Sequence, residues 1–225
     1  MTPWTQLDSA QIPNNGGELT LHQRGSAFSI RITGKRGELM NSREFNSEKV
    51  LSQVGCAHLK SVDNAKVLVG GLGMGYTLKA ALNILNDTAS VTVAELIPEV
   101  VKWNQGSLGE CAKKPLEDPR TQVHQGDVCD LLNSKVARYD AILLDIDNGP
   151  EGLTHTDNNW IYSEQGLKEI YQVLHPQGVL AIWSAGPDYL FEVRLKRIGY
   201  KVDTRTASAR ADKGTKHTIF LAKKP

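Results

Sequence analysis

Residues 67–78 read VLVGGLGMGYTL, and this stretch decides the fold. An apolar run ends in a cluster of glycines, after which Leu78, Ala81, Leu82 and Leu85 recur at the spacing of one helix face. Glycine permits both a tight turn from strand to helix and the close approach of a ligand to the backbone. The sequence therefore predicts a ligand-binding loop made of Gly71, Leu72, Gly73, Met74 and Gly75. The alternative is a tight turn that binds nothing.

Strand and helix patterns alternate from this loop toward the end of the chain. Further strands are predicted at residues 91–95, 121–124, 139–145 and 178–184. Two last strand patterns, residues 200–206 and 217–222, are joined by a segment too short for a crossover helix, so they must pair antiparallel. We therefore predict an α/β fold with a doubly wound, mostly parallel seven-stranded sheet that contains one antiparallel strand.

The first 60 residues have a different pattern. Residues 18–22 and 28–32 alternate apolar with polar side chains around a turn, which indicates a hairpin, and a short strand is possible at residues 38–40. Ser47 is predicted to be the N-cap of a helix that follows. We divide the chain into a small β-rich cap with a lead-in helix, residues 1–60, and a nucleotide-binding α/β domain, residues 61–225.

Composition and charge argue against several classes of protein. The 225 residues include 26 Lys and Arg against 25 Asp and Glu, so the net charge of +1 gives no global field for nucleic acid or an anionic membrane. No apolar run approaches the ~20 residues that span a bilayer. The N-terminus lacks the pattern of a signal peptide, and the three cysteines lack metal-ligand spacing. We expect a cytoplasmic protein without a metal and with a small-molecule substrate, and a homodimer is one option for its assembly.

Acidic residues stand where the predicted strands end. Glu95 closes the second strand twenty positions after Gly75, where a carboxylate can accept hydrogen bonds from both ribose hydroxyls, and Leu96 follows it. The glycine loop lacks the third glycine of the dinucleotide pattern. The ligand is therefore predicted to contain adenosine and not to be a dinucleotide.

Three more carboxylates follow the third and fourth strands. Asp127 and Val128 should reach the same crevice as Glu95, and Asp127 can accept a hydrogen bond from the amino group of adenine. The alternative for Asp127 is an N-cap of the following helix. Asp145 and Asp147 end a buried apolar strand, where two carboxylates are hard to explain as core. We predict that both are catalytic and that Asp145 also contacts the cofactor.

The segment after the fourth strand is predicted to contact the substrate. Asn148 follows Asp147 in a turn, and Trp160 and Tyr162 lie beyond a polar stretch that could fold over the site as a lid. The aromatic pair could pack against an aliphatic amine or a ring. The alternative is a simple packed loop.

These motifs resemble the ordered motifs of the spermidine synthases, within the larger group of class I S-adenosylmethionine-dependent methyltransferase folds. The resemblance rests on VLVGGLGMGYTL at 67–78, AEL at 94–96, DPR at 118–120, GD at 126–127 and YDAILLD at 139–145. It covers residues 66–185 well and the N-terminal region loosely. It implies S-adenosylmethionine or its decarboxylated form as cofactor, with Glu95 on the ribose, Asp127 on the adenine and Asp145 as the acid/base for an attacking amine.

Two departures from the family pattern bear on the reaction. The family carries an aspartate where Met74 stands, which pairs with the amine of the aminopropyl donor, and a second aspartate where Asn148 stands. We therefore predict methyl transfer from S-adenosylmethionine to an amine-type acceptor ahead of the alternative, aminopropyl transfer to a polyamine. A non-catalytic nucleoside-binding protein and an NAD-dependent oxidoreductase are further alternatives.

Overall fold

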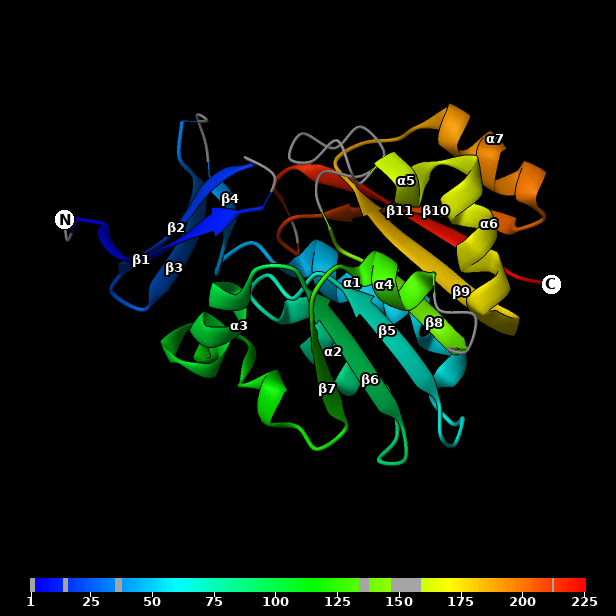
Figure 1. The fold of residues 1–225 in the computed structure, drawn as a ribbon, viewed down its shortest axis with the longest axis horizontal. Helices are drawn as coiled ribbons and strands as arrows, with labels where there is room; N and C mark the ends of the chain where they lie inside the picture. Colours follow the sequence, from blue (N-terminus) through cyan, green and yellow to red (C-terminus); the bar gives the residue numbers. More distant parts are fainter. Residues whose placement is uncertain (1–2, 14–15, 35–37, 134–137, 147–158, 212) are drawn as a thin grey trace.

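The computed structural model describes residues 3–13, 16–34, 38–133, 138–146, 159–211 and 213–225. Its larger sheet has seven strands in the order β10-β11-β9-β8-β5-β6-β7 (Figure 1). In chain order these strands are β5 (Lys66–Gly70), β6 (Ser90–Glu95), β7 (Thr121–Gln125), β8 (Tyr139–Leu144), β9 (Leu174–Ser184), β10 (Lys201–Ser208) and β11 (Lys216–Lys223).

The strand directions agree with the predicted fold class. Strand β5 pairs in parallel with β6 and β8, whereas β11 pairs antiparallel with both β9 and β10. The prediction of a mostly parallel seven-stranded sheet with one antiparallel strand is confirmed. The carboxyl ends of the parallel strands meet at one edge, and in such sheets this edge carries the ligand site.

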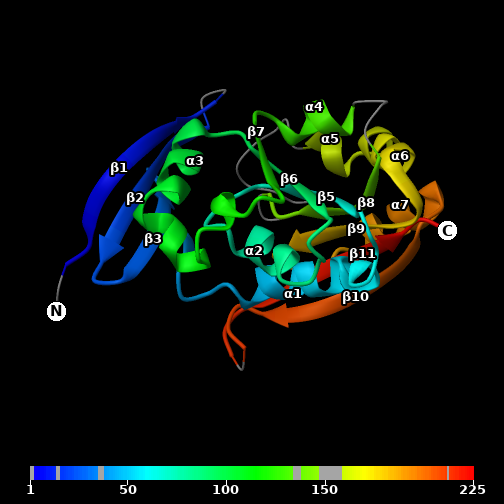
Figure 2. The same ribbon diagram turned by 90° about the horizontal axis from the view of Figure 1, so that it is seen from below.

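Both faces of the central strands are buried, because helices cover the sheet on either side (Figure 2). Val67 and Val69 of β5 belong to one apolar cluster with Leu51, whereas Leu68 belongs to a second cluster with Leu167. This alternation has the period of two that an extended strand imposes. Helices α1 and α2 lie on the first face, and α4, α6 and α7 lie on the second.

The helices are short. The α-helices are α1 (Asn46–Gly55), α2 (Tyr76–Leu82), α3 (Pro98–Gln105), α4 (Val128–Leu132), α5 (Asn159–Tyr162), α6 (Glu164–Val173) and α7 (Tyr189–Ile198). Within the described residues, 3₁₀ turns span Ala57–Leu59, Ser107–Ala112 and Pro115–Glu117. No helix in the described part of the chain is long and apolar enough to cross a bilayer.

A second, smaller sheet is formed near the N-terminus. It contains β1 (Thr5–Ile12), β2 (Gly17–Arg24), β3 (Ala27–Ile32) and β4 (Glu38–Asn41), all antiparallel and in chain order. The predicted hairpin corresponds to β2 and β3, whereas β1 was not predicted. This sheet lies beside α3 (Figure 2), where the Trp103 indole N–H donates to Asp8 Oδ2 over 2.7 Å.

The lead-in helix starts earlier than the sequence predicts. Ser47 is not the N-cap of α1: the helix begins at Asn46, and Phe45 holds the cap position. The first turn of α1 is instead anchored to β10, because Asn46 Nδ2 donates to the Ser208 carbonyl over 2.9 Å. Helix α1 packs against β9 and β10 of the large sheet. The division of the chain at residue 60 stays a prediction.

Candidate functional site

The glycine loop lies directly after β5 and has a left-handed backbone. The φ angles of Gly71, Gly73 and Gly75 are +87°, +50° and +81°. A Cβ atom on Gly71 would stand 2.4 Å from the Asp145 carbonyl oxygen, so a side chain has no room there. The Gly71 N–H donates to the Ala94 carbonyl over 3.0 Å, which holds the loop against the end of β6. The loop therefore needs glycine for its conformation and for its contact with β8.

Glu95 joins the glycine loop to the segment that follows β6. Its carboxylate accepts hydrogen bonds from the Leu72 N–H at 3.0 Å and from the Ile97 N–H at 2.9 Å. The side chain is only 8% exposed, and this burial raises the pKa of Glu95 although the backbone donors oppose the shift. Each carboxylate oxygen has a second acceptor position. Glu95 can thus hold the loop and still receive a ligand hydroxyl.

Asp127 caps helix α4, as the alternative interpretation proposed. Its Oδ1 accepts a hydrogen bond from the Cys129 N–H over 2.8 Å. Asp127 and Val128 also line a pocket at the carboxyl ends of the strands. The cap role and a ligand role are compatible, since one carboxylate can accept several hydrogen bonds.

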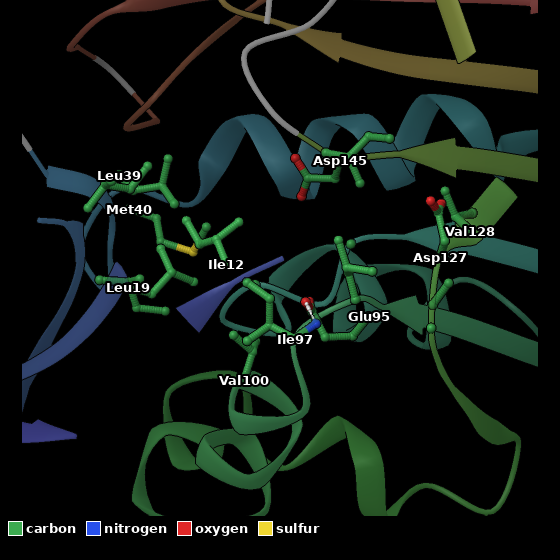
Figure 3. A pocket seen from close by; sticks show the side chains of 18 residues that line it. Ile12, Leu19, Leu39, Met40, Glu95, Ile97, Val100, Asp127, Val128 and Asp145 are labelled. Carbon is green, nitrogen blue, oxygen red and sulfur yellow. Dashed lines mark hydrogen bonds between the residues drawn. The ribbon is translucent and has the colours of Figure 1, made fainter. Parts of the chain in front are cut away.

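A first pocket lies between the end of the large sheet and the small sheet (Figure 3). Glu95, Asp127 and Asp145 stand on its polar side, together with Gly71, Gly73 and Leu96. Its opposite side is apolar and comes from the small sheet, from α3 and from the residue that caps α3: Ile12, Leu19, Leu39, Met40, Val100 and Ile97. The structure thus brings three predicted carboxylates, from the ends of three strands, to one cavity.

A second pocket adjoins the first. Gly73 and Asp145 line both, and Leu72 and Met74 of the glycine loop line only the second. The predicted loop is therefore divided between two cavities. Gly75 is not among the residues that line either pocket, and a Cβ at this position would lie 3.0 Å from Pro115 Cγ. Its contact with a ligand stays a prediction.

Glu48, a carboxylate in the second pocket, is a site residue that the sequence did not predict. Glu48 lies in the first turn of α1 and lines this pocket together with Tyr76 and Trp183. Ser47 Oγ donates to Glu48 Oε2 over 2.6 Å. A single acidic residue near a helix start is common, so nothing in the local sequence marks Glu48 as part of a site. Only the packing of α1 against the large sheet places it there.

Glu48 and Asp145 form a carboxylate pair with perturbed acidity. Burial raises the pKa of Asp145, which is opposed by a 2.5 Å hydrogen bond from Thr77 Oγ1. Burial also raises the pKa of Glu48, and the negative charge of Asp145 raises it further. Two carboxylates in one cavity of low polarity cannot both be ionised without cost. The pair is therefore predisposed to hold a proton or a cationic ligand.

We expect Glu48→Gln to stabilise the protein above neutral pH. A carboxyl whose pKa is raised on folding stabilises the fold while it is protonated, and this contribution is lost as the pH rises through the raised pKa. The free energy of unfolding of wild type should therefore fall as the pH rises from mildly acidic to alkaline. At pH 8 the free energy of unfolding of Glu48→Gln should be higher than that of wild type by about 1–3 kcal/mol, since one pKa unit corresponds to about 1.4 kcal/mol. Urea unfolding at pH 5 and pH 8 measures this. The exposed Glu110→Gln is the control, and equal pH dependence in all three proteins would contradict the prediction.

The predicted substrate-binding residues are not brought together by the described structure. Tyr162 is buried, its ring packs edge-on against Phe191 at 5.9 Å, and its hydroxyl donates to the Ile146 carbonyl over 3.2 Å. Trp160 packs against the same apolar cluster. These contacts match the packed-loop alternative. Asp147, Asn148 and the predicted lid lie outside the described residues, so their roles stay predictions.

Comparison with known proteins identifies the family. A family model described as the spermine/spermidine synthase domain matches residues 44–193. The chain is 24% identical over 127 residues to a polyamine aminopropyltransferase of Sulfolobus acidocaldarius, covering 56% of this chain and 41% of that protein. It is 29% identical over 132 residues to one of Prochlorococcus marinus, covering 58% of this chain and 44% of that protein. The matched region thus spans less than half the length of these curated relatives.

Solved structures show the same fold. A spermidine synthase from Thermotoga maritima has a TM-score of 0.74 at 16% identity, covering 98% of this chain and 73% of that one. A spermidine synthase in complex with the transition state analogue AdoDATO has a TM-score of 0.73, also at 16% identity, covering 98% of this chain and 72% of that one.

The comparisons bear on two of the predictions. The preference for methyl transfer was based on two departures, Met74 and Asn148, and it finds no support among these relatives. The resemblance to spermidine synthases is confirmed by the family match, which extends from the start of α1 into α7. Because this match covers more than half of its residues, the chain belongs to the spermine/spermidine synthase family.

Proposed function

We propose that the protein transfers the aminopropyl group of decarboxylated S-adenosylmethionine to an amine acceptor of the polyamine class. The observation that carries the proposal is the position of Asp145, which lines both adjoining pockets. Family membership supports the reaction class. A cytoplasmic location and a homodimer stay predictions.

The nucleoside of the donor fits the polar side of the first pocket. Glu95 would accept hydrogen bonds from the ribose, since its oxygens keep acceptor positions beyond those used by the Leu72 and Ile97 N–H groups. Asp127 would accept one from the adenine amino group while it caps α4. The glycine loop lets the sulfonium lie beside Gly73, where the two pockets meet.

The reaction is a displacement at the carbon next to the sulfonium. The amine lone pair forms the new C–N bond, the C–S bond breaks, and its electron pair leaves with sulfur as the neutral thioether of methylthioadenosine. The new secondary ammonium then loses one proton. Such a step depends mainly on holding the amine in line with the C–S bond, away from water.

Asp145 is the group proposed to take the proton. Burial raises its pKa toward the range in which a carboxylate works as a general base near neutral pH. Thr77 donates to one carboxylate oxygen, and the other accepts no hydrogen bond from the part of the chain that the structure describes. The carboxylate is therefore both oriented and free to act on the acceptor.

Product analysis tests the proposed reaction. The purified protein is incubated with 1,4-diaminobutane and either donor, and the products are identified by mass spectrometry. Decarboxylated S-adenosylmethionine should yield methylthioadenosine and an aminopropylated amine in equal amounts. A methylated amine with S-adenosylhomocysteine from the intact donor, and no aminopropyl product, would contradict the proposal.

Glu95→Ala should weaken nucleoside binding. The change removes the proposed ribose acceptor and leaves two backbone N–H groups without their partner, each effect being worth about 1–3 kcal/mol. Calorimetry with methylthioadenosine should show at least a ten-fold loss of affinity, at about 1.4 kcal/mol per decade. Glu99→Ala is the control, because Glu99 lies in the first turn of the neighbouring α3 and pairs with Lys102 at its surface. Unchanged affinity in Glu95→Ala would show that Glu95 does not contact the ligand.

A further inference from the structure

The second pocket has a surplus of negative charge beside the glycine loop. Glu48 and Asp145 both line it, and Met74, which forms the loop side of the wall, supplies no charge. In the described part of the chain, no lysine, arginine or histidine forms an ion pair with either carboxylate. A ligand that enters this pocket therefore meets carboxyl groups that have no counter-ion among the described residues.

The carboxylate of Glu44, near Glu48, forms an ion pair with an arginine, whereas Glu48 forms none among the described residues. Glu44 lies two residues before α1 and pairs with Arg210 of the C-terminal hairpin region at 2.8 Å. Glu48 receives neutral donors, the Ser47 hydroxyl and a backbone N–H, and no cation among the described residues. The structure thus distinguishes two acidic residues one turn apart: Glu44 has its cation within the protein, whereas Glu48 has none among the described residues.

Aromatic rings complete the wall of the second pocket. Tyr76 lines it, held by stacking on Phe45 with ring centroids 4.4 Å apart and by a 3.0 Å hydrogen bond from its hydroxyl to the Ser42 carbonyl. Trp183 lines the same pocket and packs against His217, with ring centroids 4.6 Å apart. Ring faces attract ammonium groups, and tryptophan does so most strongly. The pocket combines carboxylates with aromatic rings, which suits an alkylammonium ion.

We propose that Glu48 is the specificity-determining residue that binds the primary ammonium of the donor's aminopropyl arm. This inference rests on the proposed function, which places the sulfonium between Gly73 and Asp145. From that point the arm can extend into the second pocket toward Glu48, because Gly73 and Asp145 line both cavities. Intact S-adenosylmethionine carries a carboxylate on the same arm, and Glu48 and Asp145 repel it.

The acidity of the pair agrees with this role. The groups whose charge acts on Glu48 are Asp145 after β8 and Glu44 before α1, both negative, and burial raises its pKa as well. An ammonium in the pocket favours the ionised carboxylate. Binding of the decarboxylated donor near neutral pH should therefore release protons from the pair, whereas methylthioadenosine, which has no ammonium, should release none.

Calorimetric titrations of wild type, Glu48→Gln and Glu44→Gln test the assignment. Each protein is titrated with decarboxylated S-adenosylmethionine, the intact donor and methylthioadenosine, in buffers of different ionisation enthalpy. Glu48→Gln should lose about 10–100-fold in affinity for the decarboxylated donor, the range of a charge-assisted hydrogen bond. Its affinity for methylthioadenosine should not change, and its proton release should disappear. Glu44→Gln should retain the affinities of wild type, and its proton release should fall far less than that of Glu48→Gln, because Glu44 is the smallest of the influences on the pKa of Glu48.

A second substitution separates a local effect from a folding defect. In Glu48→Gln/Met74→Asp the loop supplies a carboxylate to the same pocket, so affinity for the decarboxylated donor should return. The assignment is overturned if Glu48→Gln binds this donor as wild type does, if it loses methylthioadenosine equally, or if wild type does not prefer this donor to methylthioadenosine. Absence of aminopropyl product with a Glu48-dependent preference intact would overturn the proposed reaction and leave the ammonium site standing.

Discussion

Replacing Asp145 with asparagine is expected to lower the rate of amine transfer by about 10²–10⁴-fold, the usual contribution of a general base. Asparagine keeps the shape of the side chain but cannot take a proton. It can also retain a hydrogen bond from Thr77 Oγ1, so the site should stay folded. Single-turnover measurements with bound donor and excess amine report the chemical step directly. Affinity for methylthioadenosine should remain close to that of wild type.

Asp147→Asn is the matched control for this experiment. Asp147 follows the same strand two positions later and lies outside the described residues, so the sequence alone recommends it. If Asp145 is the base, Asp147→Asn should affect the single-turnover rate much less. A normal rate in Asp145→Asn together with a large loss in Asp147→Asn would exchange the two roles. The rate with Asp145→Asn should also lose its dependence on pH in the range where the buried carboxyl of wild type titrates.

Gly71→Ala is expected to destabilise the protein by about 2–5 kcal/mol. A φ angle of +87° costs a residue with a side chain about 1–2 kcal/mol, and the overlap of its Cβ with the Asp145 carbonyl at 2.4 Å adds about 1–3 kcal/mol. Domains are stable by only about 5–15 kcal/mol, so this is a large fraction. The shift of the loop away from β8 should also abolish nucleoside binding. Urea unfolding and titration with methylthioadenosine measure the two effects.

Gly25→Ala separates the cost of a left-handed backbone from the cost of the overlap between a Cβ at residue 71 and the Asp145 carbonyl. Gly25 has a φ of +60° in the turn between β2 and β3, and no atom lies within 4 Å of a Cβ built there. This variant should lose only about 1–2 kcal/mol, the cost of the left-handed conformation alone. It should bind methylthioadenosine as wild type does. Equal losses of stability in both variants would show that the contact between Gly71 and β8 is not tight.

The larger sheet could be predicted because its strands carry their pattern locally. Residues 139–144 form an apolar strand that is buried on both faces, and a run of this kind is typical of a central parallel strand. The connection between β10 and β11 is too short for a helix, which leaves only the antiparallel pairing. Strand β1 escaped prediction because it is mostly exposed and polar, and its pairing with β2 decides its conformation.

The predicted carboxylates lie in one cavity because the topology of the sheet places the ends of their strands together. Glu95, Asp127 and Asp145 each follow a parallel strand, and parallel strands in one sheet end at the same edge. Tyr162 shows the opposite case. An aromatic residue in a loop can face a ligand or the core, and its sequence neighbours do not distinguish these environments, whereas the contact with Phe191 does.

The sequence by itself determined the order of strands and helices, the glycine loop and the acidic residues at the strand ends, since these depend on local patterns and on chain direction. The tertiary structure decided which side chains from distant segments share a cavity. Met74 indicated a loop without charge, and the preference for methyl transfer that followed from it finds no support among the relatives. The carboxylate of Glu48 lies in the pocket beside that loop, on a helix whose position depends on packing against the large sheet. Long-range packing of this kind leaves no periodic signal in the residues that precede the loop.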